Sequence, residues 1–234
     1  GVKESVDEAL LDNFFDRSSY LYEEPANLLK QELREPAIYN AIITAIAQGA
    51  SRINDIALKT GQENSVVSKY LGTLIDLGIV KKETPVTEKI GKKTIYELAD
   101  NFFRFWYRFV PANMSAIDSG RIQKSYANSI KKNLPDYMGL TFEHMCRDYL
   151  LYYEKDLPIE LNQVGQWWGT DNKNKKQVQI DIVGTPVKGD EYIIGVCVQI
   201  AKTPSSYPPS GADMAGKDLA IPAPLSINRV NTTG

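Results

Sequence analysis

The composition of the chain narrows its function before any motif is considered. Its 234 residues carry 27 basic and 29 acidic side chains, a formal charge of −2, which excludes a generally basic nucleic-acid protein and leaves only local patches for such a partner. Two cysteines, Cys146 and Cys197, and the single histidine, His144, lack the spacing of a zinc site. No signal peptide or membrane-length apolar run occurs, so we predict a cytoplasmic chain with no membrane partner.

Residues 1–35 are acidic, with nine Asp plus Glu against four Lys plus Arg. Apolar residues recur at helical spacing in two short runs, Val6, Ala9, Leu10 and Phe14 and then Leu28, Leu29 and Leu33. Helices this short must bury their apolar faces on something else. Two interpretations stay open: the helical tail of a preceding domain that this chain, starting at Gly1, lacks, or an extension of the region that follows.

Residues 36–98 show three helical patterns that each end at a glycine, namely Gly49, Gly61 and Gly78. Their apolar positions are Ile38, Ala41, Ile42, Ala45 and Ile46, then Ile53, Ile56 and Ala57, then Val67, Tyr70, Leu71, Leu74 and Leu77. We expect Ser51 and Asn64 to cap the second and third helices. Two strands follow, over 79–83 and 92–98, and this order is that of a winged helix-turn-helix.

The third helix of this region has a polar side that suits nucleic acid. Hydroxyls, an amide and one cation at helical spacing can contact phosphates and base edges in a major groove, and they are Asn64, Ser65, Ser68, Lys69 and Thr73. The hairpin adds Lys89, Lys92 and Lys93 for phosphates. The region has eight Lys plus Arg against six Asp plus Glu, a small surplus, so packing against protein neighbours is the alternative.

Residues 99–140 open with an aromatic block that holds Phe102, Phe103, Phe105, Trp106, Tyr107 and Phe109. So many rings on one helix predict burial at a domain junction, while Arg104 and Arg108 leave open a stacking platform for single strands. In the connecting segment we expect a solvated face formed by Arg121, Lys124, Lys131 and Lys132. Pro135 and Gly139 are expected to interrupt its helices.

Residues 141–200 predict one helix followed by three strands. The helix covers 141–155, and the strands cover 164–168, 177–183 and 192–199. Residues 201–234 are rich in Pro, Gly, Ser, Ala and Thr, which predicts an irregular tail that is tied to a sheet edge or to a second chain. The whole chain is therefore expected to be α+β.

Several motifs in this order resemble the carboxyl-terminal half of the archaeal-type ATPases of the AAA+ class, found in archaea and bacteria. They are 21–25 (LYEEP), 32–36 (ELREP), 85–89 (PVTEK), 102–110 (FFRFWYRFV), 167–171 (WWGTD) and 180–183 (IDIV). The resemblance covers residues 5–200. It implies that residues 1–35 are the helical tail of a preceding nucleotide-binding module that is absent here. It also implies a winged helix over 36–98 and, over 141–200, a domain like the PD-(D/E)xK nucleases with a small mixed sheet.

The resemblance also implies which residues would carry chemistry. No G-x-x-x-x-G-K-[ST] loop occurs, so ATP and Mg²⁺ belong only to the missing module and no cofactor is expected in this chain. Glu143 and Asp181 match the acidic positions of the nuclease family, whereas Val196 and Val198 stand where the family has Glu and Lys. The nuclease-like domain is therefore expected to be degenerate and inactive.

We accordingly expect a DNA-binding and regulatory region of an AAA+ ATPase. Its expected partners are duplex DNA, its own ATPase module and a second copy of the chain. A protein-interaction module without nucleic acid is the alternative, and a metal-dependent nuclease is a third possibility that the two valines count against.

Overall fold

The computed structural model describes residues 5–86, 93–171, 175–189, 191–197 and 225–231. The fold is α+β, as predicted. The chain divides into a helical unit, Gly1–Glu83 with Ile90–Leu134, and a sheet unit, Thr84–Lys89 with Pro135–Gly234. Among the described residues, no helix has the length and apolar character needed to cross a lipid bilayer.

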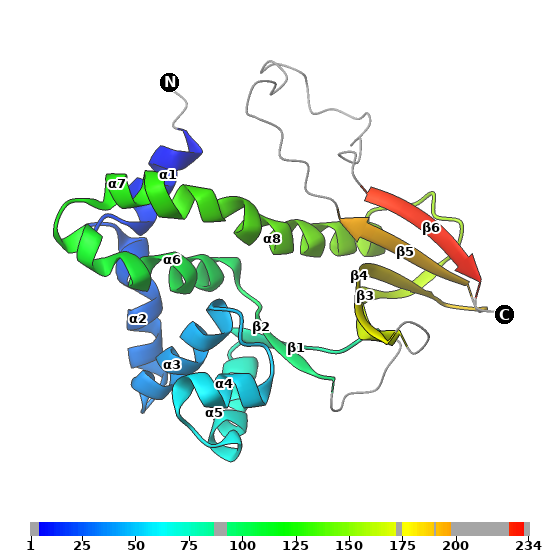
Figure 1. The fold of residues 1–234 in the computed structure, drawn as a ribbon, viewed down its shortest axis with the longest axis horizontal. Helices are drawn as coiled ribbons and strands as arrows, with labels where there is room; N and C mark the ends of the chain where they lie inside the picture. The colour runs from blue at the N-terminus through cyan, green and yellow to red at the C-terminus, as the bar shows by residue number, and fades with distance from the viewer. Residues whose placement is uncertain (1–4, 87–92, 172–174, 190, 198–224, 232–234) are drawn as a thin grey trace. The chain divides into compact units, whose positions relative to one another are not determined.

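The helical unit contains the helix and strand order of a winged helix (Figure 1). Two amino-terminal helices come first, α1 (Val6–Phe14) and α2 (Tyr20–Glu32). The winged helix consists of α3 (Pro36–Ala47), α4 (Ile53–Thr60), α5 (Asn64–Asp76) and the antiparallel strands β1 (Val80–Glu83) and β2 (Ile95–Leu98). It is followed by α6 (Asn101–Asp118), α7 (Ile122–Ser125) and a π-helix, η1 (Tyr126–Ile130).

The two predicted caps are wrong. Neither α4, which starts after Arg52, nor α5, which starts after Glu63, has a side-chain cap. The carbonyl of Ser51 instead accepts a hydrogen bond from the backbone N–H of Tyr96, at 2.7 Å. Asn64 lies inside the first turn of α5, and its side chain donates to Asn54. Each helix starts one residue away from the predicted position, with Arg52 and Glu63 as the N-cap residues.

The buried residues of the winged helix differ from the predicted apolar positions in α3 and directly after α5. Tyr39 and Ile43 are buried on α3, whereas Ala41 is exposed and Leu77 is 39% exposed. The rings of Tyr39 and Tyr70 lie 4.7 Å apart. The Tyr70 hydroxyl donates to Glu35, and this bond raises the pKa of Tyr70 to about 12. Aromatic contacts thus join the start of α3 to the middle of α5.

The amino-terminal helices pack on the aromatic block of α6. The Phe14 ring lies 4.4 Å from that of Phe105, and Trp106 donates through Nε1 to the carbonyl of Tyr22 at 2.8 Å. Five of the six rings are buried, and Phe102 is half-buried. Their faces are therefore occupied by protein, which contradicts the stacking platform and agrees with the predicted burial. Val6, at 75% exposed, does not join this core.

The predicted interruptions at Pro135 and Gly139 are also wrong, because α8 runs without a break over Lys131–Tyr152. The hydrogen bond that Pro135 removes would reach Lys131, where the π-geometry of η1 changes to α. The helix therefore lacks this hydrogen bond at a place where its geometry is already irregular. Gly139 costs a helix only about 1 kcal/mol, which packing can offset. The four basic residues predicted to form a solvated face are exposed: Arg121, Lys124, Lys131 and Lys132.

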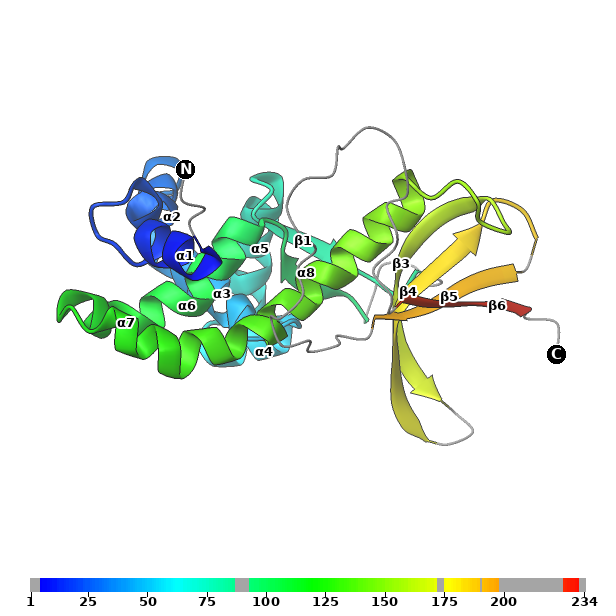
Figure 2. The ribbon, with the colours of Figure 1, turned by 90° about the horizontal axis from the view of Figure 1, so that it is seen from above.

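The sheet unit holds four strands beside the carboxyl-terminal part of α8 (Figures 1 and 2). They are β3 (Leu161–Asp171), β4 (Lys176–Pro186), β5 (Glu191–Cys197) and β6 (Leu225–Asn231), in the spatial order β3-β4-β5-β6. All three described pairings are antiparallel, so the expected mixed sheet is corrected. Cys146 and Leu150 of α8 pack on Ile182 of β4, with Phe142, Leu157 and Val164 around them.

The strand β6 corrects part of the predicted irregular tail. Residues 225–231 pair along the whole of β5, from Cys197 opposite Leu225 to Glu191 opposite Asn231. This agrees with the expectation that the tail is tied to a sheet edge, since β6 occupies backbone groups that β5 would otherwise leave unpaired. The remaining tail positions, 201–224 and 232–234, lie outside the described residues.

Candidate nucleic-acid interface

The polar side of α5 is accessible. Asn64, Ser65, Ser68 and Lys69 are exposed, and Thr73 is half-buried. The opposite side of the helix holds the buried Val67, Tyr70, Leu71 and Leu74. Because residues three and four apart share one side of a helix, the core of the unit fixes the direction in which the polar groups face. The five α5 residues predicted as contacts therefore share one surface.

A shallow hollow of about 550 Å³ lies between α4 and the start of α5. Its lining is uncharged and consists of Asn54, Ala57, Leu58, Gly61, Gln62 and Asn64. Asn64 donates through Nδ2 to Oδ1 of Asn54, at 2.8 Å. Gly61 has φ of 66°, which a residue with a side chain rarely adopts, and it permits the sharp turn between the helices. Asn54 and Gln62 were not among the predicted contacts, although Asn54, Leu58 and Gly61 recur at helical spacing.

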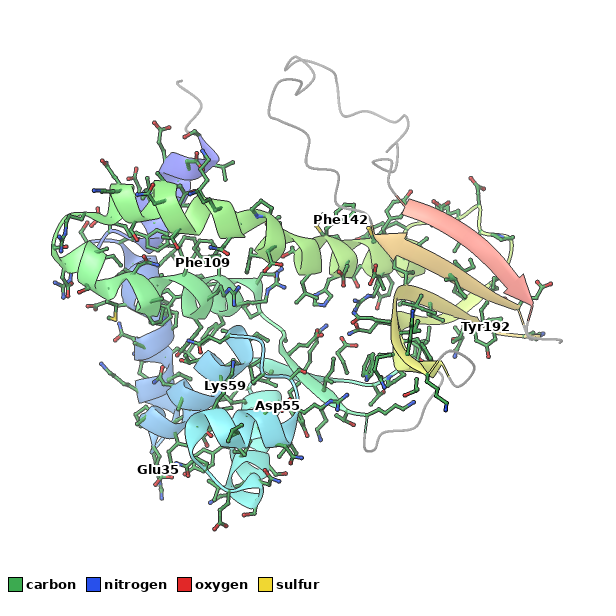
Figure 3. The ribbon with its side chains drawn as sticks, viewed as in Figure 1. Glu35, Asp55, Lys59, Phe109, Phe142 and Tyr192 are labelled. Atoms are coloured by element: carbon green, nitrogen blue, oxygen red, sulfur yellow. The ribbon has the colours of Figure 1, made fainter. Side chains whose placement is uncertain are left out.

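The charges around this surface are mixed. Exposed cations from the helices and the hairpin are Arg52, Lys59, Lys69 and Lys82, and exposed acids are Asp55, Glu63 and Asp76. Lys59 donates to the carbonyl of Gln48 at 2.9 Å, and Figure 3 shows it with Asp55 on α4. The Lys69 ammonium lies 5.9 Å from the centre of the Tyr70 ring and is exposed. Phosphate contacts would therefore depend on a few cations rather than on a broad basic patch.

The hairpin contributes less than the sequence suggested. Lys93 is half-buried and engaged with other groups, and Lys89 and Lys92 lie outside the described residues. Lys81 is held by two carboxylates, with Nζ 2.6 Å from Glu83 Oε1 and 3.7 Å from Glu97 Oε2. Lys82, which was not among the predicted contacts, is exposed on β1.

The two acidic nuclease-family positions lie in the sheet unit, around a buried arginine. Arg147 of α8 donates through Nε to the backbone carbonyl of Asp181 at 3.1 Å. Its Nη2 lies 3.4 Å from Glu143 Oε2, one helical turn earlier. Asp181 sits in a bulge of β4, because Asp181 and Ile182 together oppose Gln166 between two paired positions.

These residues do not fit a magnesium site. Ile182 pairs with Gly195, and the next residue in the sequence, Val196, is a valine, which has no side-chain oxygen for a cation. A permanent guanidinium already lies against Glu143, where it would repel a divalent cation. Val198 lies outside the described residues.

The fold and the exposed surface define a class: an α+β protein with a winged-helix unit and a separate antiparallel sheet unit. Residues 106–198 match the model of a family, DUF234, described as archaeal and bacterial proteins of unknown function. The chain is also 33% identical, over 153 residues, to an uncharacterized protein of Methanocaldococcus jannaschii. That alignment covers 64% of this chain and 34% of the relative, so the chain spans about a third of the relative's length. No solved structure matches the chain.

Proposed function

We propose that the helical unit binds duplex nucleic acid, with α5 as the helix that enters the major groove. The observation that carries this proposal is the exposed polar side of α5, held outward by the buried side of the same helix. The second helix of a helix-turn-helix reads base edges with its amino-terminal residues. In α5 those positions hold Asn64, Ser65 and Ser68.

The side chains supply the two kinds of contact that such a complex needs. Lys69 and the exposed Arg52 and Lys82 suit phosphates, which set affinity and orientation. Side-chain amides such as that of Asn64 can pair with the donor and acceptor of adenine in the major groove. Serine hydroxyls can either donate or accept a hydrogen bond. The small number of cations predicts modest affinity that depends on salt.

We further propose that the chain is a DNA-binding and regulatory region of an AAA+ type ATPase, whose nucleotide-binding module lies outside this sequence. Support comes from the ordered motifs between residues 21 and 183 and from a relative about three times as long as the matched segment. ATP and Mg²⁺ would belong to that module. A cytoplasmic location and self-association are parts of the same proposal.

Salt titration of duplex binding tests the first proposal. The affinity of the chain for a duplex of about 20 base pairs should fall as NaCl rises, with a slope near −0.9 for each phosphate contact. Lys69→Ala should weaken binding to every sequence and reduce the slope by about 1, because one phosphate contact is lost. Fluorescence anisotropy measures both quantities.

Lys30→Ala is the matched control, since Lys30 is an exposed lysine in the last turn of α2, outside the winged helix. It should leave the slope unchanged. Equal effects of the two substitutions, or no binding at low salt, would contradict the duplex-binding proposal.

One observation favours a protein-interaction module as the second candidate. Leu58 on α4 is 85% exposed and lines the uncharged hollow beside α5. An exposed leucine in an uncharged recess suits an apolar side chain of a protein partner. If Leu58→Ser abolishes binding to a protein partner while duplex binding is absent, this second function replaces the first.

We also propose that the sheet unit does not cut nucleic acid. No cleavage should appear with Mg²⁺ or Mn²⁺, because among the described residues Glu143 and Asp181 have no third carboxylate beside them and the Arg147 cation lies against Glu143. Asp181→Ala should leave that result unchanged. Gel assays of single-stranded and duplex substrates check this. Metal-dependent cutting that disappears in Asp181→Ala would refute it.

A further inference from the structure

Three exposed large apolar side chains lie on α8, seven residues apart. Met138, Met145 and Tyr152 are 46%, 60% and 70% exposed, and all three belong to the sheet unit. Seven residues are close to two turns of an α-helix, so these side chains form one apolar stripe about 21 Å long. At its carboxyl-terminal end the rings of Tyr149 and Tyr153 stack 6.4 Å apart, and Tyr153 is also 70% exposed.

The stripe is separate from the side of α8 that packs on the sheet. Cys146 and Leu150 make that packing contact, because they are buried around Ile182 of β4. Consecutive residues of a helix point about 100° apart, so Met145 faces a different direction from Cys146. A row of large apolar side chains left exposed beside a complete core is typical of an interaction surface.

We propose that two copies of the chain associate through this stripe, with their α8 helices antiparallel and crossing at Met145. A two-fold contact uses the same patch on both copies. Met138 and Tyr152 lie seven residues before and after Met145, so each Met138 would lie opposite Tyr152 of the second copy. Methionine adapts its shape to a partner and makes favourable contacts with aromatic rings. This contact rests on the self-association proposed above and gives it a defined surface.

A carboxylate beside the stripe favours the antiparallel direction. Asp148 is exposed on α8 between Met145 and Tyr152. Parallel helices in register would place it opposite Asp148 of the second copy, where the like charges repel each other. Antiparallel helices that cross at Met145 place it beside the uncharged Thr141 instead. The stripe is narrow, so the contact is small and the dimer should be weak.

The variant Met145→Lys tests the centre of the contact. It should weaken dimerisation at least about tenfold, because two ammonium groups would meet at the two-fold axis. Sedimentation equilibrium up to about 0.5 mM detects a dimer even if its Kd is on the order of 100 μM. Met114→Lys is the matched control, since Met114 is a 45% exposed methionine of α6 in the helical unit. It should leave dimerisation unchanged.

Cysteine cross-linking tests the direction of the helices. Met145→Cys should form a disulfide between copies on mild oxidation, because the two side chains meet at the axis. Met138→Cys alone should not, since its two copies would lie about 21 Å apart along the helix, beyond the reach of a disulfide. A mixture of Met138→Cys and Tyr152→Cys chains should cross-link. The parent chain, whose cysteines are Cys146 and Cys197, gives the background.

The outcomes separate the contact from the proposals on which it rests. A parent chain that stays monomeric, with no cross-link in Met145→Cys, contradicts both self-association and the contact. If the chain dimerises but Met145→Lys and Met114→Lys behave alike, self-association stands and the stripe is wrong. Cross-linking of Met138→Cys alone would show parallel helices and overturn the antiparallel contact. No measurement involves nucleic acid, so a failure of duplex binding is detected separately.

Discussion

Arg147→Ala should lower the free energy of unfolding of the sheet unit by about 3 kcal/mol. Removing one member of a fully buried ion pair costs about 3–5 kcal/mol, and the lower end applies because the Glu143 side chain retains 22% exposure to water. The substitution also removes the donor to the Asp181 carbonyl, which joins α8 to β4. Urea unfolding followed by the fluorescence of Trp167 and Trp168, both on β3, measures the change.

Two companion variants sharpen this prediction. Asp148→Ala, at an exposed neighbouring position of α8, should stay within about 0.5 kcal/mol of the parent chain. Glu143→Ala should also destabilise the sheet unit, because it leaves the buried Arg147 guanidinium without its carboxylate. A loss below about 1 kcal/mol for Arg147→Ala would show that the guanidinium does not hold the helix to the sheet.

Trp106→Ala should destabilise the helical unit by about 3–5 kcal/mol, the range for deleting a large buried ring. Trp106 is buried at the contact between α6 and α2, and its Nε1 donates to the Tyr22 carbonyl. The ring therefore holds α2 against α6 within the helical unit. Urea unfolding followed by far-ultraviolet circular dichroism, with hydrogen exchange of α2 amides, measures the loss.

Met114→Ala is the control for this prediction, since Met114 is an exposed apolar residue of the same helix. It should change stability by less than about 0.5 kcal/mol. Trp106→Phe retains a ring but removes the donor, so it should cost about 1–3 kcal/mol. If α2 amides in Trp106→Ala exchange no faster than in the parent chain, the ring does not anchor that helix.

The helical unit and the sheet unit differ in the polar groups that they expose. The helical unit presents polar groups outward on α5, whereas the sheet unit keeps its acidic positions beside an arginine. The proposal of duplex binding without cleavage rests on these two observations.

The exposed and buried sides of α5 were predictable because they follow from one helical period. Val67, Tyr70 and Leu74 repeat at three and four residues, and the polar groups fall between them. The burial of the α6 rings followed from their number alone. The hollow beside Asn64 was not predictable in this way, because it depends on the angle at which Gly61 turns α4 into α5.

Other features depend on residues that are distant in sequence. The spacing of Glu143 and Arg147, four residues apart on one helix, could have indicated their ion pair. The bond from Arg147 to the Asp181 carbonyl was decided by the packing of α8 on β4, which no spacing along the chain reports. The continuity of α8 through Pro135 depended on the π-turn that precedes it. The predicted caps failed because the two helices start one residue away from the predicted positions, with Arg52 and Glu63 at the N-cap.

By itself, the sequence determined the α+β class, the order of helices and strands through the winged helix, and which side of α5 is apolar. These properties arise from interactions between near neighbours along the chain, so local periodicity records them. The tertiary structure alone decided the antiparallel pairing of β6 with β5, the bond from Arg147 to the Asp181 carbonyl and the packing of Val86 against Gly165. Each of these is a contact across a long stretch of chain, and it exists only once strand register and helix packing have brought the partners together.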